Sequence, residues 1–148
     1  MACCAILPPN ELAGIHRFRV NRNMATPDTQ LQAMRFLSEN WDGYGATAPQ
    51  TQLIELAREF VSLVEALLRR RAVNPDVIHV NPTRTGGILI EWVDGIMQHE
   101  VEINPDHSLA FLHLNKTTGH IDTRKLSPGP QAVVHPGLLQ QLCQLLAA

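Results

Sequence analysis

The sequence predicts an α+β domain in which helices pack on one face of an antiparallel sheet. Three observations favour this class. From Pro27 to Ala72 the apolar residues recur at helical spacing, and after Pro75 they alternate with a period of two. Turn sequences such as Asp94-Gly95 separate the alternating runs, which indicates hairpins between neighbouring strands. Helices followed by a run of strands are typical of α+β proteins.

The first helix is predicted to begin at Pro27. Thr26 suits the N-cap, Pro27 suits the first helical position, and Asp28 complements the positive end of the helix dipole. Glycines in the segment 40–46 stop the helix. Its predicted apolar face is Leu31, Met34 and Leu37 or Phe36.

A longer helix is predicted from near Pro49 to about Ala72. Its apolar face is wide enough to lie flat on a sheet or on other helices. Three arginines, Arg69, Arg70 and Arg71, follow at the end where cations complement the helix dipole. The predicted stripe is Leu53, Leu56, Phe60, Val64 and Leu67, widened by Ile54, Ala57, Val61 and Leu68.

Four or five short strands are predicted to follow as an antiparallel meander, because the connections between them are tight. Alternation places Trp92 on the helix-facing side with Ile88 and Ile90, and Glu91 on the opposite side. A short Leu-rich helix after Pro136 completes the predicted fold. The predicted strands span residues 77–80, 88–93, 97–103, 109–114 and 120–125.

The chain of 148 residues is long enough for one domain with its own core. We predict this domain over residues 26–148. Residues 1–25 are predicted to form an arm, in which the alternation from Ile15 to Val20 is typical of an edge strand or of a segment that orders against a partner.

Composition excludes several classes of protein. The content of 45% hydrophobic and 18% charged residues argues against disorder, and a net charge of -2 argues against nucleic-acid binding by bulk charge. No apolar run approaches the roughly 18 residues that a membrane span needs. Three cysteines, two of them adjacent, make a poor disulfide framework and favour a cytoplasmic location. No P-loop or GxGxxG motif is present, so we expect no cofactor.

Two segments resemble a motif of small uncharacterised bacterial proteins. The first reads Asn40-Trp41-Asp42-Gly43-Tyr44-Gly45-Ala46 and precedes the long helix. The second reads Gly86-Gly87-Ile88-Leu89-Ile90-Glu91-Trp92 and precedes the alternating acidic and aliphatic residues 100–103. One departure is Ile90, where leucine is more usual. The resemblance covers roughly residues 31–114. It implies a shared fold unit and transfers no activity.

The first motif holds the only tyrosine and one of the two tryptophans. Trp41 and Tyr44 are candidates for a recognition surface, and Asp42 is a candidate acceptor or general base. The favoured interpretation is structural. It is a corner between helices in which the glycines take positive φ, Asp42 bonds to backbone amides, and the rings fill the edge of the core.

Three carboxylates, Glu91, Glu100 and Glu102, fall on the predicted open side of the sheet. A pocket that held them in unlike environments would suit acid/base chemistry. The favoured interpretation is the solvated face of a sheet that is buried on one side only.

Histidines and arginines give two further hypotheses. His79, His99 and His113 lie in predicted strands and would form a zinc site if they shared a face, but no HExxH or paired CxxC accompanies them, and we predict no metal site. Six arginines would suit a phosphate-binding patch, yet no nucleic-acid motif accompanies them. These are Arg17, Arg19, Arg22, Arg69, Arg70 and Arg71.

We therefore predict a non-catalytic interaction or regulatory module that docks another protein or a second copy of itself. By analogy, bacterial or phage-borne antitoxins, immunity factors and inhibitors are the expected kind. The competing hypothesis is a small enzyme or ligand-binding domain that uses Asp42, Tyr44, Glu91 and Glu102, and nucleic-acid binding is a weaker one. The candidate interaction residues are Trp41, Asp42, Tyr44, Glu91, Trp92 and Glu102.

Overall fold

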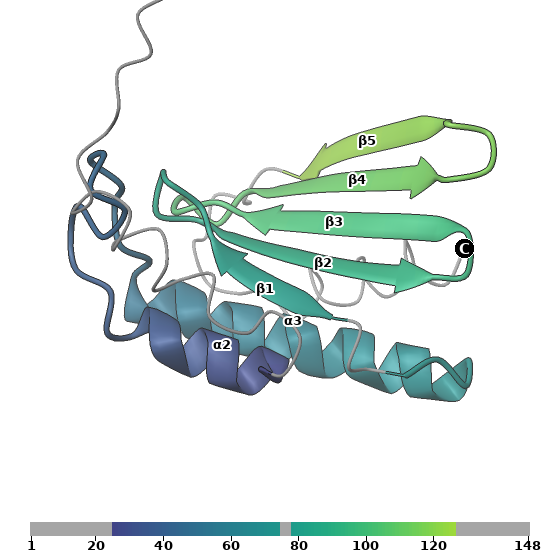
Figure 1. The fold of residues 1–148 in the computed structure, drawn as a ribbon, viewed down its shortest axis with the longest axis horizontal. Coiled ribbons are helices and arrows are strands. Elements are labelled where there is room, and N and C mark those ends of the chain that lie inside the picture. The colour runs from purple at the N-terminus through teal and green to yellow at the C-terminus, as the bar shows by residue number, and fades with distance from the viewer. Residues whose placement is uncertain (1–24, 75–77, 127–148) are drawn as a thin grey trace, which may run out of the picture.

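A computed structural model describes residues 25–74 and 78–126. Two helices precede a five-stranded sheet, which confirms the α+β class (Figure 1). The predicted N-terminal arm up to residue 24 and the predicted C-terminal helix lie outside the described residues. The elements are α2 (Pro27–Met34), α3 (Thr51–Arg70), β1 (His79–Pro82), β2 (Ile88–Asp94), β3 (Met97–Ile103), β4 (Leu109–Asn115) and β5 (Ile121–Leu126).

The sheet is a meander in the order β1-β2-β3-β4-β5, and every neighbouring pair is antiparallel. The last four strands lie within a residue of their predicted positions. β1 lies later than predicted, because its hairpin closes at the bond from the Thr83 amide to the Gly87 carbonyl (2.9 Å). The strand therefore continues to Pro82, two residues beyond its predicted end.

α2 begins as the sequence predicts. The Thr26 hydroxyl accepts a hydrogen bond from the Thr29 amide at 3.3 Å, and Pro27 occupies the first turn. The helix ends at Met34. Of the two residues considered for the core, Leu37 packs against it, whereas Phe36 is 87% exposed.

α3 ends in a Schellman motif. The Val73 amide bonds to the Leu68 carbonyl (2.9 Å) and the Ala72 amide to the Arg69 carbonyl (3.1 Å). Ala72 takes the left-handed conformation that this motif requires, with φ 57°. Val73 is partly buried against the core, so the helix ends where the chain turns back onto apolar surface.

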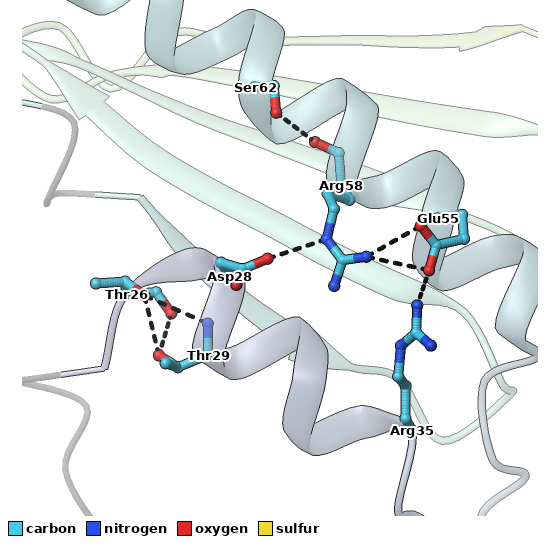
Figure 2. Close-up of polar contacts among 7 residues, drawn as sticks. All are labelled: Thr26, Asp28, Thr29, Arg35, Glu55, Arg58 and Ser62. Atoms are coloured by element: carbon cyan, nitrogen blue, oxygen red, sulfur yellow. Dashed lines mark hydrogen bonds and ion pairs between the residues drawn. The ribbon is translucent and has the colours of Figure 1, made fainter.

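Ion pairs join the two helices (Figure 2). Arg58 of α3 contacts Asp28 of α2 through Nε at 3.0 Å and Glu55 of its own helix through Nη1 at 3.0 Å. Arg35 also donates to Glu55 from beyond the end of α2. Because these side chains are partly exposed, each pair contributes about 0–1 kcal/mol, and apolar packing must supply most of the stability.

The core lies between the helices and one face of the sheet. Every residue of the predicted apolar stripe of α3 is buried except Leu67, which is half-buried. The described part of the chain holds no buried polar residue. Neither described helix is long and apolar enough to cross a membrane. The sheet contributes Val80, Ile88, Ile90, Trp92, Val101, Ile103, Leu109 and Phe111 to this core.

Candidate functional site

The open face is the side of the sheet that points away from this core. All its side chains are half-buried or exposed, and no described element packs over them. Register places them in cross-strand rows, so neighbours on adjacent strands lie side by side. The three longest strands each place three side chains on this face: Leu89, Glu91 and Val93 from β2, Gln98, Glu100 and Glu102 from β3, and Ala110, Leu112 and Leu114 from β4.

The charge on this face is concentrated in an acidic track, which we define as Glu91, Glu100 and Glu102. Two of its members lie on the central strand β3: Glu102 stands between Leu89 of β2 and Ala110 of β4, and Glu100 stands between Glu91 of β2 and Leu112 of β4. None of the three takes part in an ion pair with another described residue. The open face is thus an anionic line flanked by apolar surface.

Glu91 and Glu100 stand directly opposite each other. The hydrogen bond from the Thr83 amide to the Gly87 carbonyl fixes the pairing pattern of β1 with β2, so the Glu91 backbone bonds toward β1. In the same way, the bond from the Lys116 amide to Ile96 turns the Glu100 backbone toward β4. The two glutamates are therefore a non-hydrogen-bonded pair, in which Cα atoms lie only about 4.5 Å apart.

Neutral amides are the hydrogen-bond partners of these two carboxylates. Asn81 Nδ2 donates to Glu91 at 3.2 Å, and Gln98 Nε2 donates to Glu100 at 2.9 Å. These bonds hold the carboxylates in place but leave their like charges uncompensated. Like charges directly opposite each other on a sheet are destabilising, so the free protein holds an electrostatic strain that a cation would relieve.

The loop 40–46 is tied to the turn between β1 and β2. Asp42 Oδ1 accepts hydrogen bonds from the amides of Tyr44 (2.8 Å) and Ala46 (3.0 Å), and Oδ2 accepts from Arg84 Nε (2.8 Å). Desolvation alone would raise the pKa of Asp42, but the two amides and Arg84 outweigh it and lower that pKa. A carboxylate held ionised by these donors is a structural acceptor and a poor general base.

The aromatic residues of the two motifs lie in different environments. Tyr44 is 62% exposed, so its ring does not fill the edge of the core as the structural interpretation expected. Trp41 is half-buried and donates from Nε1 to the Thr47 carbonyl at 3.1 Å. Trp92 is 3% exposed on the helix-facing side, which separates it from the open face. Of these rings, Tyr44 is the one displayed to solvent.

The four residues of the enzyme hypothesis do not form one cleft. Asp42 and Tyr44 contact Arg84 in the β1–β2 turn, whereas Glu91 and Glu102 lie on the open face. Among the described residues, no hydrogen bond or ion pair joins the loop to either glutamate. A small cavity of about 20 Å³, room for about one water molecule, lies instead on the helix side between Leu68, Arg71 and Trp92.

The three strand histidines divide between the two faces. His79 lies opposite Glu91 on the open face, while His99 and His113 lie opposite each other on the helix-facing side. A single face for all three, which the zinc hypothesis required, is therefore wrong. The described residues contain no group of three or more histidines, cysteines and acids placed to hold a metal ion.

His99 and His113 form a hydrogen-bonded pair with their Nδ1 atoms 2.6 Å apart, and the ring of Trp92 stacks on His99. Burial, the charge of His113 and that of Arg71 lower the pKa of His99 to about 4, against an opposing effect of Asp94. Burial also lowers the pKa of His113. Sequence analysis placed both residues in strands, and only the register revealed their common face and their contact.

The structure describes only three of the six arginines of the phosphate-binding hypothesis. Arg69 and Arg70 end α3, and Arg71 forms an ion pair with Asp94 at 2.7 Å. The arginines at positions 17, 19 and 22 lie outside the described residues. Because Arg71 serves the packing between α3 and β2, it is not a free phosphate ligand.

Neither a family model, nor a curated protein, nor a solved structure matches this chain. Its class is therefore defined by its own structure, as an α+β domain whose two described helices cover one face of a five-stranded meander, with no described element over the other, acidic and apolar face. The resemblance to small bacterial proteins stays a prediction from the two motifs.

Proposed function

We propose that the protein is a non-catalytic interaction module that binds a basic, amphipathic segment of another protein on its open face. The observation that carries the proposal is the opposed pair Glu91 and Glu100 within an acidic track flanked by leucine and valine. A segment with Lys or Arg along its middle and aliphatic side chains at its sides matches this surface in charge and in polarity.

Two physical effects support the binding. Burial of half-buried side chains such as Leu89, Leu112 and Leu114 contributes about 25 cal/mol for each Å² of apolar surface removed from water. A cation placed between Glu91 and Glu100 converts a repulsion into two attractions, which favours basic partners and speeds association at low salt. The aliphatic flanks thus supply affinity, and the acidic track supplies specificity.

Within this proposal, the role is that of a regulator in a bacterial or phage-borne system. An antitoxin, immunity protein or inhibitor acts by covering a surface that its target needs, and nucleases and toxins often present basic ones. This step rests on analogy between small binding domains.

The experiment compares three immobilised baits in extracts of the source cell. The wild-type protein is the first, Glu100→Lys is the second, and Glu59→Lys is the matched control. Glu59 is exposed on α3, so its reversal changes the net charge equally without touching the open face. We expect a basic protein that the wild type and Glu59→Lys retain, with binding at least about ten-fold weaker to Glu100→Lys.

Salt provides the second measurement. Binding through the acidic track should weaken steadily as ionic strength shortens the Debye length. If all three baits retain the same proteins, or none, the open face is not the docking surface.

A further inference from the structure

The two outer edges of the sheet are built differently. At β1, every second residue directs its backbone groups away from β2, and these include Val80 and Pro82. The Val80 amide bonds to Oε1 of Gln30 on α2 at 2.7 Å, and Pro82 has no N–H to offer. Figure 1 shows α2 alongside this strand. The β1 edge is therefore closed to another strand.

The β5 edge has none of these protections among the described residues. The bond from the Asn115 amide to the His120 carbonyl (2.9 Å) sets the pairing pattern, so Asp122, Arg124 and Leu126 bond toward β4. Ile121, Thr123 and Lys125 then direct their N–H and C=O groups outward. All three residues are exposed, and β5 lies at the edge of the sheet farthest from the helices (Figure 1).

We infer that β5 is a self-association edge, where a second copy of this chain adds its own β5 antiparallel and joins the two five-stranded sheets into one. A two-fold axis perpendicular to the sheet keeps both open faces on the same side. Such an axis passes midway between the two β5 strands, so that one residue lies directly opposite its own copy. The sequence of β5 decides which residue that is.

Charge selects Thr123 as the centre. In this register Asp122 faces the partner's Arg124 and Arg124 faces the partner's Asp122, which gives two symmetric ion pairs on the helix-facing side. Centring on Asp122 or on Arg124 would place like charges opposite each other. Thr123 then pairs with its own copy, and threonine pairs are favourable across strands.

The same register satisfies the backbone. Ile121 and the partner's Lys125 form a hydrogen-bonded pair, as do the two Thr123 residues, and each such pair exchanges two backbone hydrogen bonds. The aliphatic stem of Lys125 also covers Ile121, which is 55% exposed in the free chain. This inference goes beyond the proposed function, because it uses the edge of the sheet and not the open face.

The first test is the proline variant Thr123→Pro, measured by sedimentation equilibrium against the chain mass of 16.4 kDa. The Thr123 amide is not used in the β4–β5 ladder, so proline removes only the outward donor. The matched control Thr123→Val keeps that donor and the β-branched shape. We expect twice the chain mass for wild type and Thr123→Val, and the single mass for Thr123→Pro with unchanged far-ultraviolet circular dichroism.

The second test is a charge swap, which decides the register whether or not the proline variant folds. Asp122→Arg and Arg124→Asp should each weaken the dimer at least about ten-fold, since each creates like-charge contacts. The double variant should recover wild-type affinity. A wild type that stays monomeric at millimolar concentration, a Thr123→Pro dimer as tight as wild type, or a double variant weaker than both singles overturns the inference.

Discussion

His99 and His113 show at the residue scale how a pair of neighbours sets a chemical state that neither residue specifies alone. Their Nδ1 atoms share one hydrogen bond beneath Trp92, so one nitrogen donates and the other must accept. A second proton at this contact has no acceptor, and it would place two like charges in a partly buried site. The fold therefore favours the pair in a form that is not doubly protonated.

This pair predicts an acid-sensitive fold. The pKa of His99 falls from 6.5 in the unfolded chain to about 4 in the folded one, chiefly through burial and His113. The unfolded chain thus binds a proton at higher pH, so stability is complete above about pH 6.5 and falls as the pH drops toward 4. After allowance for solvent screening, we expect a loss of about 1–2 kcal/mol in the free energy of unfolding.

Urea unfolding between pH 7 and pH 4 measures this loss. His99→Leu should flatten the pH dependence, while His120→Gln, an exposed residue of the β4–β5 turn, should leave it unchanged. An equally steep dependence in His99→Leu would show that other groups cause it.

Asp42, at the corner between the helices, is a second residue whose chemical state is set by its neighbours. As the favoured interpretation expected, it accepts hydrogen bonds from backbone amides, and Gly43 and Gly45 take positive φ. The sequence could not identify Arg84 as its ion-pair partner, because that residue lies 42 positions further along the chain. The adjacent exposure of Tyr44 also depends on how the loop docks on the β1–β2 turn.

At the scale of single elements, alternation and turn residues located the boundaries of most strands. The end of α3 depends instead on where the chain folds back onto the core. Alternation and turn residues placed β2 to β5 within a residue, because a buried face and a tight turn fix register together. The end of α3 depends on Ala72 and Val73, where the chain folds back so that Val73 reaches the core. The arginines near the end of α3 indicate the region in which the helix ends, but not the residue at which it ends.

Ala72 predicts a stabilising substitution. Its φ of 57° is unfavourable for alanine and free for glycine, so Ala72→Gly should raise the free energy of unfolding by about 0.5–1 kcal/mol. The matched control is Ala66→Gly, exposed within the same helix, which should lower it by a similar amount. Urea midpoints for both variants check the pair, and a destabilised Ala72→Gly would contradict the left-handed cap.

At the scale of the whole molecule, the helices divide the sheet into two faces and two edges. They cover one face and close the β1 edge, so that within residues 25–74 and 78–126 the open face and the β5 edge are the surfaces left for a partner and for a second copy. Because one surface is a face and the other an edge, both can be occupied together. Association through β5 would also align two acidic tracks on one continuous sheet.

The acidic track predicts a conflict between stability and binding. Glu100→Gln removes the repulsion with Glu91 and keeps an acceptor for Gln98, so the free protein should gain about 0.2–1 kcal/mol of stability at low salt. Partner binding should weaken in the same variant. Thermal unfolding at low and high salt measures the gain, with Glu59→Gln on α3 as control. A variant less stable than wild type would refute uncompensated charge at this position.

The sequence by itself determined the class of the fold, the order of the described helices and strands, and the side of the sheet on which the residues of β2 and β3 lie. These properties follow from periodicity and turn chemistry, which act between residues close in the chain. Only the tertiary structure decided that His99 meets His113, that Glu91 opposes Glu100 and that Arg84 binds Asp42. It also decided that Gln30 closes one edge of the sheet, while no described segment pairs with the outer edge of β5. Such contacts depend on register and on docking between distant segments, where many partners satisfy the same local pattern.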